Sequence, residues 1–423
     1  MHRASALVVA RPEPNDPARE RCSTVVTVAS KVKSRVAAGS MIFDSWDIAA
    51  SVIAHFVSQG VTDFYLADHR STGNPRDEFL STIPENAVIH WVRKESPRFT
   101  QMVTLTALAN LARKDGFEAF IAFDADEFFV GSERPLVDEI VDWLDNESTM
   151  SLRCEMINFY QSHEVQAFTP SALSSVRYSA NKGLAPNESR QERNPQFRRF
   201  PFYYRRSKAI MRLVPGSEGD YDWINFGNHH VMNISTKERY PATRSATIKV
   251  LHLPYRSREG ITARKGNKLR KKPAGIFTFD TGSAEFSMTD SEREKEWQLA
   301  SIPTGMILPE TKVGEATAIL DDRISNLEPK ITSLLRSPKS PKASWIDESA
   351  RMADVSQDLA MSLVVFAGLT QSRFLDGSNS DNSKPQSPVD YQKLERKIIK
   401  LQSRIDNLRP NLLRLVLNRL RRR

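Results

Sequence analysis

The stretch at residues 119–130 constrains the fold of this chain more than any other part of its sequence. It reads Ala-Phe-Ile-Ala-Phe-Asp-Ala-Asp-Glu-Phe-Phe-Val, an apolar run that stops abruptly at Asp124 and Asp126. This is typical of a buried strand whose carboxyl end opens into a site, which is where open α/β sheets bind ligands. On an extended strand the two carboxylates would point to one side and suit Mg²⁺ or Mn²⁺. The plainer interpretation is a strand followed by an acidic turn.

Strands and helices alternate around this stretch. Apolar patterns predict strands at 36–43, 61–67, 88–92 and 150–156, and helices at 45–59, 102–115 and 135–144. Such alternation is typical of right-handed βαβ units. The sequence therefore predicts an α/β fold with a mainly parallel sheet, followed by C-terminal helices. The strands that end at Asp68 and Asp124 would deliver their carboxylates to the same edge of this sheet.

Four short motifs follow one another in this region. They are Met-Ile-Phe-Asp-Ser-Trp-Asp-Ile from Met41, His55 with Gly-Val-Thr-Asp-Phe from Gly60, Asp-His-Arg-Ser-Thr-Gly from Asp68, and Asp-Ala-Asp-Glu-Phe from Asp124. In order and spacing they resemble the family-2-like glycosyltransferases of bacteria, over roughly residues 35–272. The resemblance implies a GT-A fold, the Rossmann-like fold of nucleotide-diphospho-sugar transferases.

The same resemblance implies roles for individual residues. Asp68, and the loop after the first strand with Asp44, would hold the donor nucleotide. Asp124 and Asp126 match the Asp-x-Asp motif of the family, which holds the metal and the diphosphate of the donor. The implied cofactor is Mn²⁺ or Mg²⁺.

The sequence departs from the family pattern at three positions. Ser45 replaces an acidic residue, Gly73 follows Thr72 where an aspartate usually intervenes, and Met102 stands where acidic residues are frequent. None of these positions belongs to the proposed metal pair. They favour an alternative function, a catalytically degenerate GT-A-fold protein that acts as a binding or scaffold protein.

Two histidines are candidates for a further metal ligand. His229 lies in Gly-Asn-His-His-Val and His252 in Leu-His-Leu-Pro-Tyr-Arg-Ser, and both blocks resemble later motifs of the family. Many GT-A enzymes complete the metal shell with a late histidine, although an isolated histidine is more often a hydrogen-bonded structural residue. We favour His252 over His229, because a strand predicted at 247–251 would hold it rigidly.

A basic run follows this histidine. Residues 256–272 hold eight basic residues and one acidic residue. The run is either a solvated helix face or, as we prefer, a flap whose cations, Arg256 and Lys265 among them, neutralise a leaving diphosphate. An inverting enzyme also needs a carboxylate base, for which Asp220 and Asp222 are weak candidates.

Composition limits the location and the partners of the chain. Its 423 residues contain two cysteines, which favours a reducing, cytoplasmic compartment, and no stretch approaches the ~18 apolar residues of a membrane-spanning helix. The net charge is +9, yet residues 256–272 carry +7 and residues 390–423 carry +8, so the remaining chain carries −6. Charge confined to two segments, without a recognisable nucleic-acid-binding module, makes nucleic acid an unlikely partner.

Changes in composition divide the chain into five segments. We expect a poorly ordered extension at 1–34, a GT-A glycosyltransferase domain at 35–280, a helical region at 281–374, a flexible linker at 375–389 and a basic tail at 390–423. In the helical region, heptad spacing begins at Leu320 and continues to Leu334. The tail joins a short coiled-coil seam to a basic amphipathic segment after Pro410, which predicts weak self-association and peripheral contact with the anionic inner face of the plasma membrane.

These patterns together predict an enzyme of the hexosyltransferase class. It would move a sugar from a nucleotide-diphosphate sugar donor to a glycan or glycolipid acceptor, such as a lipid-linked glycan, with the help of a metal ion. The alternative remains the degenerate binding or scaffold protein, favoured by Ser45, Gly73 and Met102 and opposed by the intact pair Asp124 and Asp126.

Overall fold

The computed structural model describes residues 35–73, 75–94, 98–99, 101–180, 207–214, 222–224, 230–233, 239–260, 279–280, 290–298, 300–303, 308–313, 316–336, 343–353 and 355. By its contacts the chain divides into two units, Met1–Lys33 and Ser34–Arg423, and every described residue lies in the second. The sequence predictions for the extension at 1–34, the linker at 375–389 and the tail at 390–423 lie outside the described residues.

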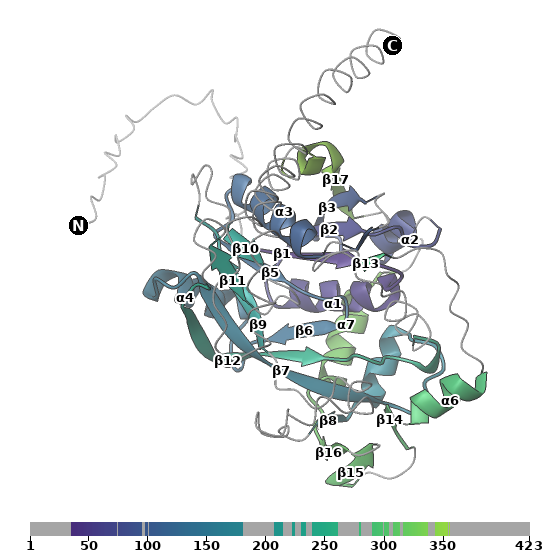
Figure 1. The fold of residues 1–423 in the computed structure, drawn as a ribbon. Coiled ribbons are helices and arrows are strands. Elements are labelled where there is room, and N and C mark those ends of the chain that lie inside the picture. Colours follow the sequence, from purple (N-terminus) through teal and green to yellow (C-terminus); the bar gives the residue numbers. More distant parts are fainter. Residues whose placement is uncertain are drawn as a thin grey trace, which may run out of the picture. The chain divides into compact units, whose positions relative to one another are not determined.

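The first half of the described chain alternates strands and helices (Figure 1). Its elements are β1 (Val36–Ile42), α1 (Trp46–Ser58), β2 (Asp63–Asp68), α2 (Pro75–Thr82), β3 (Val88–Arg93), β4 (Arg98–Phe99), α3 (Gln101–Lys114), β5 (Ala119–Ala122), β6 (Glu127–Val130), α4 (Leu136–Asn146) and β7 (Ser151–Ser162). The strands and helices predicted in this part are present, and α2 is an additional helix that begins at Pro75.

Short strands dominate the second half. Its elements are η1 (Pro170–Ser175), β8 (Tyr178–Ala180), β9 (Ser207–Arg212), β10 (Asp222–Ile224), β11 (Val231–Asn233), β12 (Ala242–His252), β13 (Phe279–Asp280), α6 (Asp290–Gln298), β14 (Ser301–Ile302), β15 (Glu310–Val313), β16 (Ala316–Leu320), η6 (Ser325–Leu327), α7 (Glu328–Leu334) and β17 (Ser344–Asp347).

One large sheet organises these elements. Strands β17, β3, β2, β1 and β5 lie side by side in this order and run parallel. Beyond β5 the pairing becomes antiparallel through β9 to β7, and β12 runs parallel to β7 but antiparallel to β6. The predicted α/β fold with parallel central strands is confirmed. Because β1, β2 and β5 end at one edge, the loops that follow them meet there.

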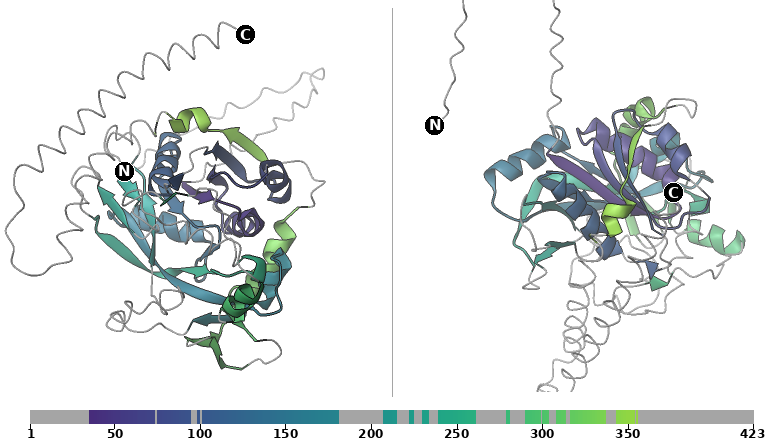
Figure 2. Two further views of the ribbon diagram at one scale, coloured as in Figure 1. Left: turned by 45° about the vertical axis from the view of Figure 1, so that its right-hand side comes forward. Right: turned by 90° about the horizontal axis from the view of Figure 1, so that it is seen from above.

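Helices cover both faces of the parallel strands (Figures 1 and 2). Helices α1, α2, α4 and α7 contribute to one apolar core, and α3 packs into a second core with β10 and β11. Helix α1 illustrates the cause, since Ile48, Val52, Ile53 and Phe56 repeat at helical spacing and are fully buried. Each such side chain contributes about 1.5–3 kcal/mol through burial. The helix ends before Gly60, whose φ of +93° suits glycine.

The predicted helical region at 281–374 is wrong in its described part. Helices α6 and α7 are present, but β14, β15 and β16 lie between them, and β17 follows. Leu320, where the heptad pattern begins, is the last residue of β16 and is 36% exposed. Strand β17 joins the edge of the sheet beside β3, so this region contributes strands to the same sheet. Among the described helices, none combines the length and apolarity needed to cross a membrane.

Candidate active site

The acidic stretch forms a turn at the end of β5. The N–H of Glu127 donates to the carbonyl of Asp124 at 3.1 Å, and β6 begins at Glu127. The prediction that Asp124 and Asp126 share one side of an extended strand is therefore wrong, and the plainer interpretation of an acidic turn is correct. Aspartate is favoured at the first position of such a turn. Because of the turn, the two aspartate side chains contact different partners.

Asp124 lies against Lys208, a residue that sequence analysis did not identify as part of the site. Lys208 Nζ lies 2.9 Å from Asp124 Oδ2 and 2.8 Å from Glu127 Oε1. Gln101 Nε2 donates to Asp124 Oδ1 at 2.8 Å. Strand β9 explains this position, because it runs antiparallel to both β5 and β7 and so brings Lys208 to the end of β5. Its side chain is 3% exposed.

Burial and charge set the protonation of these three groups. Burial raises the pKa of Glu127 to about 8. Burial acts in the same direction on Asp124, but the Lys208 cation outweighs it and holds the pKa of Asp124 below its usual range. Burial of Lys208 lowers its pKa, but the carboxylates of Asp124 and Glu127 outweigh burial and raise the pKa of Lys208. Lys208 is therefore a fixed positive charge at this edge of the sheet.

Asp126 lies beside His252, the histidine favoured by the sequence. His252 is the last residue of β12, where it is in register with Glu127 of β6 and Asn158 of β7. Its Nε2 is 3.5 Å from Asp126 Oδ1, and its Nδ1 is 2.7 Å from Asn158 Oδ1. When neutral His252 donates from Nδ1 to Asn158, its Nε2 carries a lone pair and faces a carboxylate oxygen, an arrangement that a cation between them would stabilise.

This pair fits a metal ion in part. In the described chain, Asp124, Asp126 and His252 do not bring three ligand atoms within 4.8 Å of one another. Asp126 and His252 fit as two protein ligands of Mn²⁺ or Mg²⁺, because such ions often take their other ligands from water and substrate phosphates.

The other two predicted donor-binding aspartates hold adjacent loops together. Asp68 is fully buried, and its Oδ1 accepts the N–H of Ser71 at 3.0 Å. Asp44 has a φ of +47°, donates its N–H to Ser71 Oγ at 3.1 Å and accepts the N–H of Thr72 at 2.7 Å. The loops after β1 and β2 are therefore fixed to each other at the carboxyl edge of the sheet.

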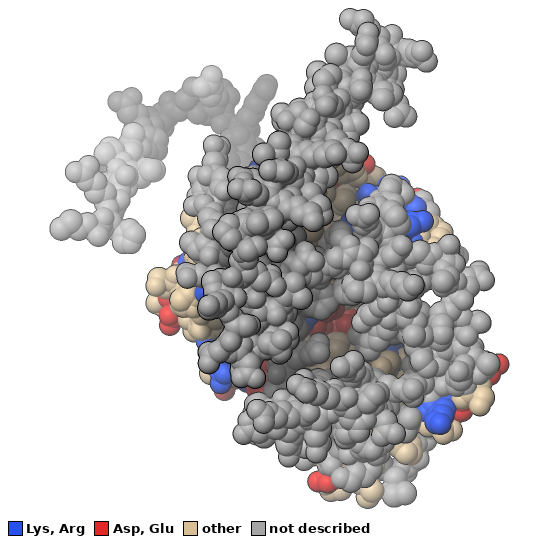
Figure 3. Space-filling model, in the orientation of Figure 1, with Lys and Arg blue, Asp and Glu red and all other residues tan. Residues whose placement is uncertain are grey.

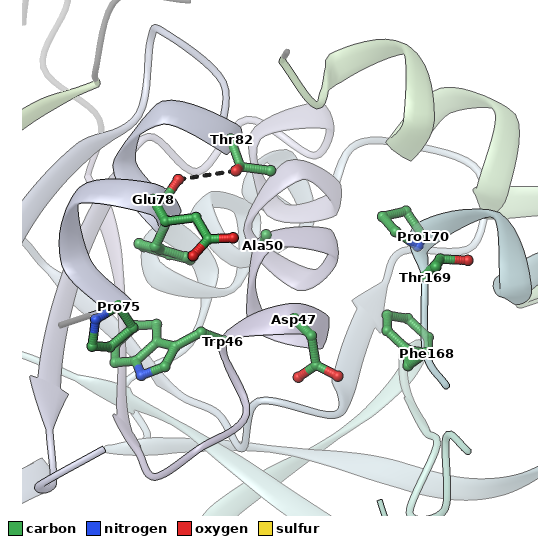
Figure 4. Close-up of a pocket in the computed structure, with 10 residues that line it drawn as sticks. Trp46, Asp47, Ala50, Pro75, Glu78, Thr82, Phe168, Thr169 and Pro170 are labelled. Carbon is green, nitrogen blue, oxygen red and sulfur yellow. Dashed lines mark hydrogen bonds between the residues drawn. The ribbon is translucent and has the colours of Figure 1, made fainter. Parts of the chain in front are cut away.

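A pocket of about 340 Å³ opens beside these loops (Figure 4). Trp46 lines it, stacks on Trp91 with ring centroids 4.8 Å apart, and donates from Nε1 to Ser71 Oγ at 2.9 Å. The carboxylates of Asp47 and Glu78 and the ring of Phe168 also line the pocket. The pocket thus combines aromatic surface with carboxylates.

Arg256 borders this pocket rather than the Asp124 turn. Its guanidinium donates two hydrogen bonds to the carboxylate of Asp47, at 2.8 and 2.9 Å. Asp222 lies in the short strand β10, on the side of the sheet that α3 covers. Asp220, His229 and Lys265 lie outside the described residues. In the space-filling view of Figure 3, acidic atoms are visible near the middle of the face that is turned toward the reader.

Neither a protein-family model nor a curated protein sequence matches this chain. Among solved structures, the chain is similar to a UDP-glucose pyrophosphorylase complexed with UDP-glucose, at 10% sequence identity and a TM-score of 0.19. The similarity covers 56% of this chain and 99% of that one. So low a score carries no argument about function.

Proposed function

We propose that this protein is a glycosyltransferase that moves a sugar from a nucleotide-diphosphate sugar to a glycan or lipid-linked glycan. The observation that carries the proposal is the pair Asp126 and His252, 3.5 Å apart, beside the buried cation of Lys208. The pair lies at the carboxyl edge of the sheet, the edge at which α/β folds bind their ligands. The sequence motifs around Asp44, Asp68 and Asp124 support the same assignment.

The side chains at this edge suit a diphosphate leaving group. Asp126 and His252 would hold Mn²⁺ or Mg²⁺, which supplies Lewis-acid stabilisation of the leaving nucleotide when bound. Asn158 fixes the ring of His252 through Nδ1. Lys208 is immobilised by Asp124 and Glu127, so its charge is already in place when negative charge develops.

We assign the pocket beside Trp46 to the acceptor. Sugar rings offer apolar C–H faces and hydroxyl groups, and the pocket provides aromatic surface from Trp46 and Phe168 with carboxylates from Asp47 and Glu78. Arg256, which holds Asp47 in place, links this pocket to the segment that follows His252. An acceptor in the pocket would therefore lie on the same edge of the sheet as the donor.

Thermal unfolding of the full-length protein with a panel of nucleotide-diphosphate sugars, with and without Mn²⁺, tests the proposal. A donor present at 100 times its Kd should stabilise the fold by about 2.7 kcal/mol, and only with the metal. Asp126→Asn should abolish this effect, whereas Asp138→Asn, a change on the exposed face of α4, should retain it. Stabilisation by no donor, or equal stabilisation of both variants, would contradict the proposal.

One observation favours the alternative of a binding or scaffold protein. Lys208 and Gln101 already contact both carboxylate oxygens of Asp124, the residue that the Asp-x-Asp motif assigns to the metal. A degenerate protein should bind a nucleotide sugar without releasing nucleoside diphosphate from it. Measuring nucleoside diphosphate release with the donors that bind, in the presence of candidate glycan acceptors, separates the two functions.

A further inference from the structure

A second group of metal-binding side chains lies apart from the Asp124 turn, on the α3 side of the sheet. His90 of β3, Asp115 after α3 and Glu348 after β17 each place a potential ligand atom within 4.8 Å of the others. His90 Nδ1 donates to Glu348 Oε1 at 2.8 Å. Tyr65, stacked on His90 with centroids 4.1 Å apart, donates its hydroxyl to Asp115 Oδ2 at 2.6 Å.

The guanidinium of Arg351 stands where a cation would bind. Its Nη1 is 3.0 Å from Glu348 Oε1 and 3.3 Å from Asp115 Oδ2, and its Nη2 is 2.7 Å from Asp115 Oδ1. The Arg351 side chain is 43% exposed. Because Glu348 is fully buried, its carboxylate needs a cation beside it, so Arg351 can turn out into solvent only when another cation takes its place.

Charge and hydrogen bonding indicate that the group attracts more than Arg351. Asp63 Oδ1 lies 4.0 Å from His90 Nε2, and the carboxylates of Asp115 and Glu348 contact the guanidinium of Arg351, so the group holds three carboxylates and one guanidinium. Glu348 is fully buried, and its Oε2 has no hydrogen-bond partner within the described part of the chain. A buried carboxylate oxygen without a donor is costly, and a metal ion would satisfy it.

We propose that His90, Asp115 and Glu348 form a Zn²⁺ site, and that Zn²⁺ binds there by displacing Arg351. An imidazole with two carboxylates is a ligand set that zinc accepts, at bond lengths of about 2.0–2.2 Å. Ligand atoms bound this closely lie about 3.4 Å apart in a tetrahedral site, so His90 Nδ1 and Glu348 Oε1, which are 2.8 Å apart, must separate slightly to admit the ion. The bound ion would tie the end of edge strand β17 to β3 and to the end of α3.

Isothermal titration of full-length protein with Zn²⁺ tests this site, with Asp126→Asn introduced throughout to weaken binding beside His252. Arg351→Gln should bind Zn²⁺ about tenfold more tightly, because the competing cation is gone. His90→Gln and Glu348→Gln should each bind it at least about tenfold more weakly. Arg323→Gln removes a comparable guanidinium, paired with Asp321 at 2.6 Å, and should change nothing.

Two further measurements keep the result interpretable. Glu348→Gln is nearly isosteric and preserves the oxygen that accepts from His90, so circular dichroism should show an intact fold even if His90→Gln does not fold. Co²⁺ in place of Zn²⁺ should give the d–d absorption of a four-coordinate site, enhanced in Arg351→Gln. Zn²⁺ affinity that is unchanged in Arg351→Gln, or retained in Glu348→Gln, would overturn the proposal.

Discussion

Replacing Lys208 by methionine should destabilise the protein strongly, because this substitution leaves two carboxylates without their cation. Above pH ~8, where Glu127 with its raised pKa is ionised, its attraction to Lys208 at 2.8 Å and an effective dielectric constant of ~20 is about 6 kcal/mol before desolvation is subtracted. The contact with Asp124 is more screened, since that side chain is 36% exposed. Removing one partner of a buried pair costs about 3–5 kcal/mol, and we expect Lys208→Met to fall in this range.

Urea unfolding followed by tryptophan fluorescence measures this cost, with Lys114→Met on the exposed end of α3 as the control. Adding Glu127→Gln to Lys208→Met removes the stranded carboxylate yet keeps an oxygen for the N–H of Asp124. The double variant should therefore recover stability, with a coupling energy of about 2 kcal/mol or more. Additive effects, or a cost below about 1 kcal/mol for Lys208→Met, would refute the buried ion pair.

Three other predictions concern separate parts of the chain. Burial lowers the pKa of His55 to about 4, so as the pH falls below ~6.5 this histidine is protonated in the unfolded state before it is protonated in the folded state. The free energy of unfolding should therefore drop by about 3 kcal/mol between pH 6.5 and 4. In urea unfolding, His55→Gln should make the free energy of unfolding depend less on pH over this range. His252→Ala should weaken Mn²⁺ affinity in calorimetry more than His229→Ala, and the reverse order would assign the ligand to His229. In co-sedimentation, full-length protein should bind anionic vesicles but not neutral ones, with a gain of about 1 kcal/mol per basic residue near the surface. Protein that ends at Pro388 should bind neither kind of vesicle.

The sequence predicted the parallel half of the sheet because each element there has a strong local signal. Strands β1, β2 and β5 are continuous apolar runs, and α1 and α3 have apolar faces at helical spacing. The weaker elements escaped prediction for physical reasons. Strand β17 has four exposed residues, so it has no alternating pattern and depends on pairing with β3. The spacing of Leu320 with the following apolar residues imitates a helix, although β16 is held by β15 and β8.

The sequence predicted only those site residues whose position follows from the strand next to them in the chain. Asp126 and His252 were both identified, because Asp126 comes shortly after the apolar strand β5 and His252 ends the apolar run of β12. Lys208 was missed because its role depends on β9 lying antiparallel between β5 and β7, a pairing over more than 80 residues that composition does not indicate. The one available signal was a lysine at the start of an otherwise apolar strand, at a position that the structure buries.

The charges at this edge lead to a last prediction, that donor binding depends on a divalent cation. Asp124, Asp126 and Glu127 stand against one lysine, so the edge is negative whether or not Glu127 is protonated. A diphosphate is itself anionic and would be repelled, whereas a divalent ion held by Asp126 and His252 makes the edge neutral or positive. A donor that binds in Mn²⁺ should therefore bind at least about tenfold more weakly in EDTA. Equal binding in EDTA would mean that protein cations neutralise the diphosphate, and Arg256 would then be the first residue to replace.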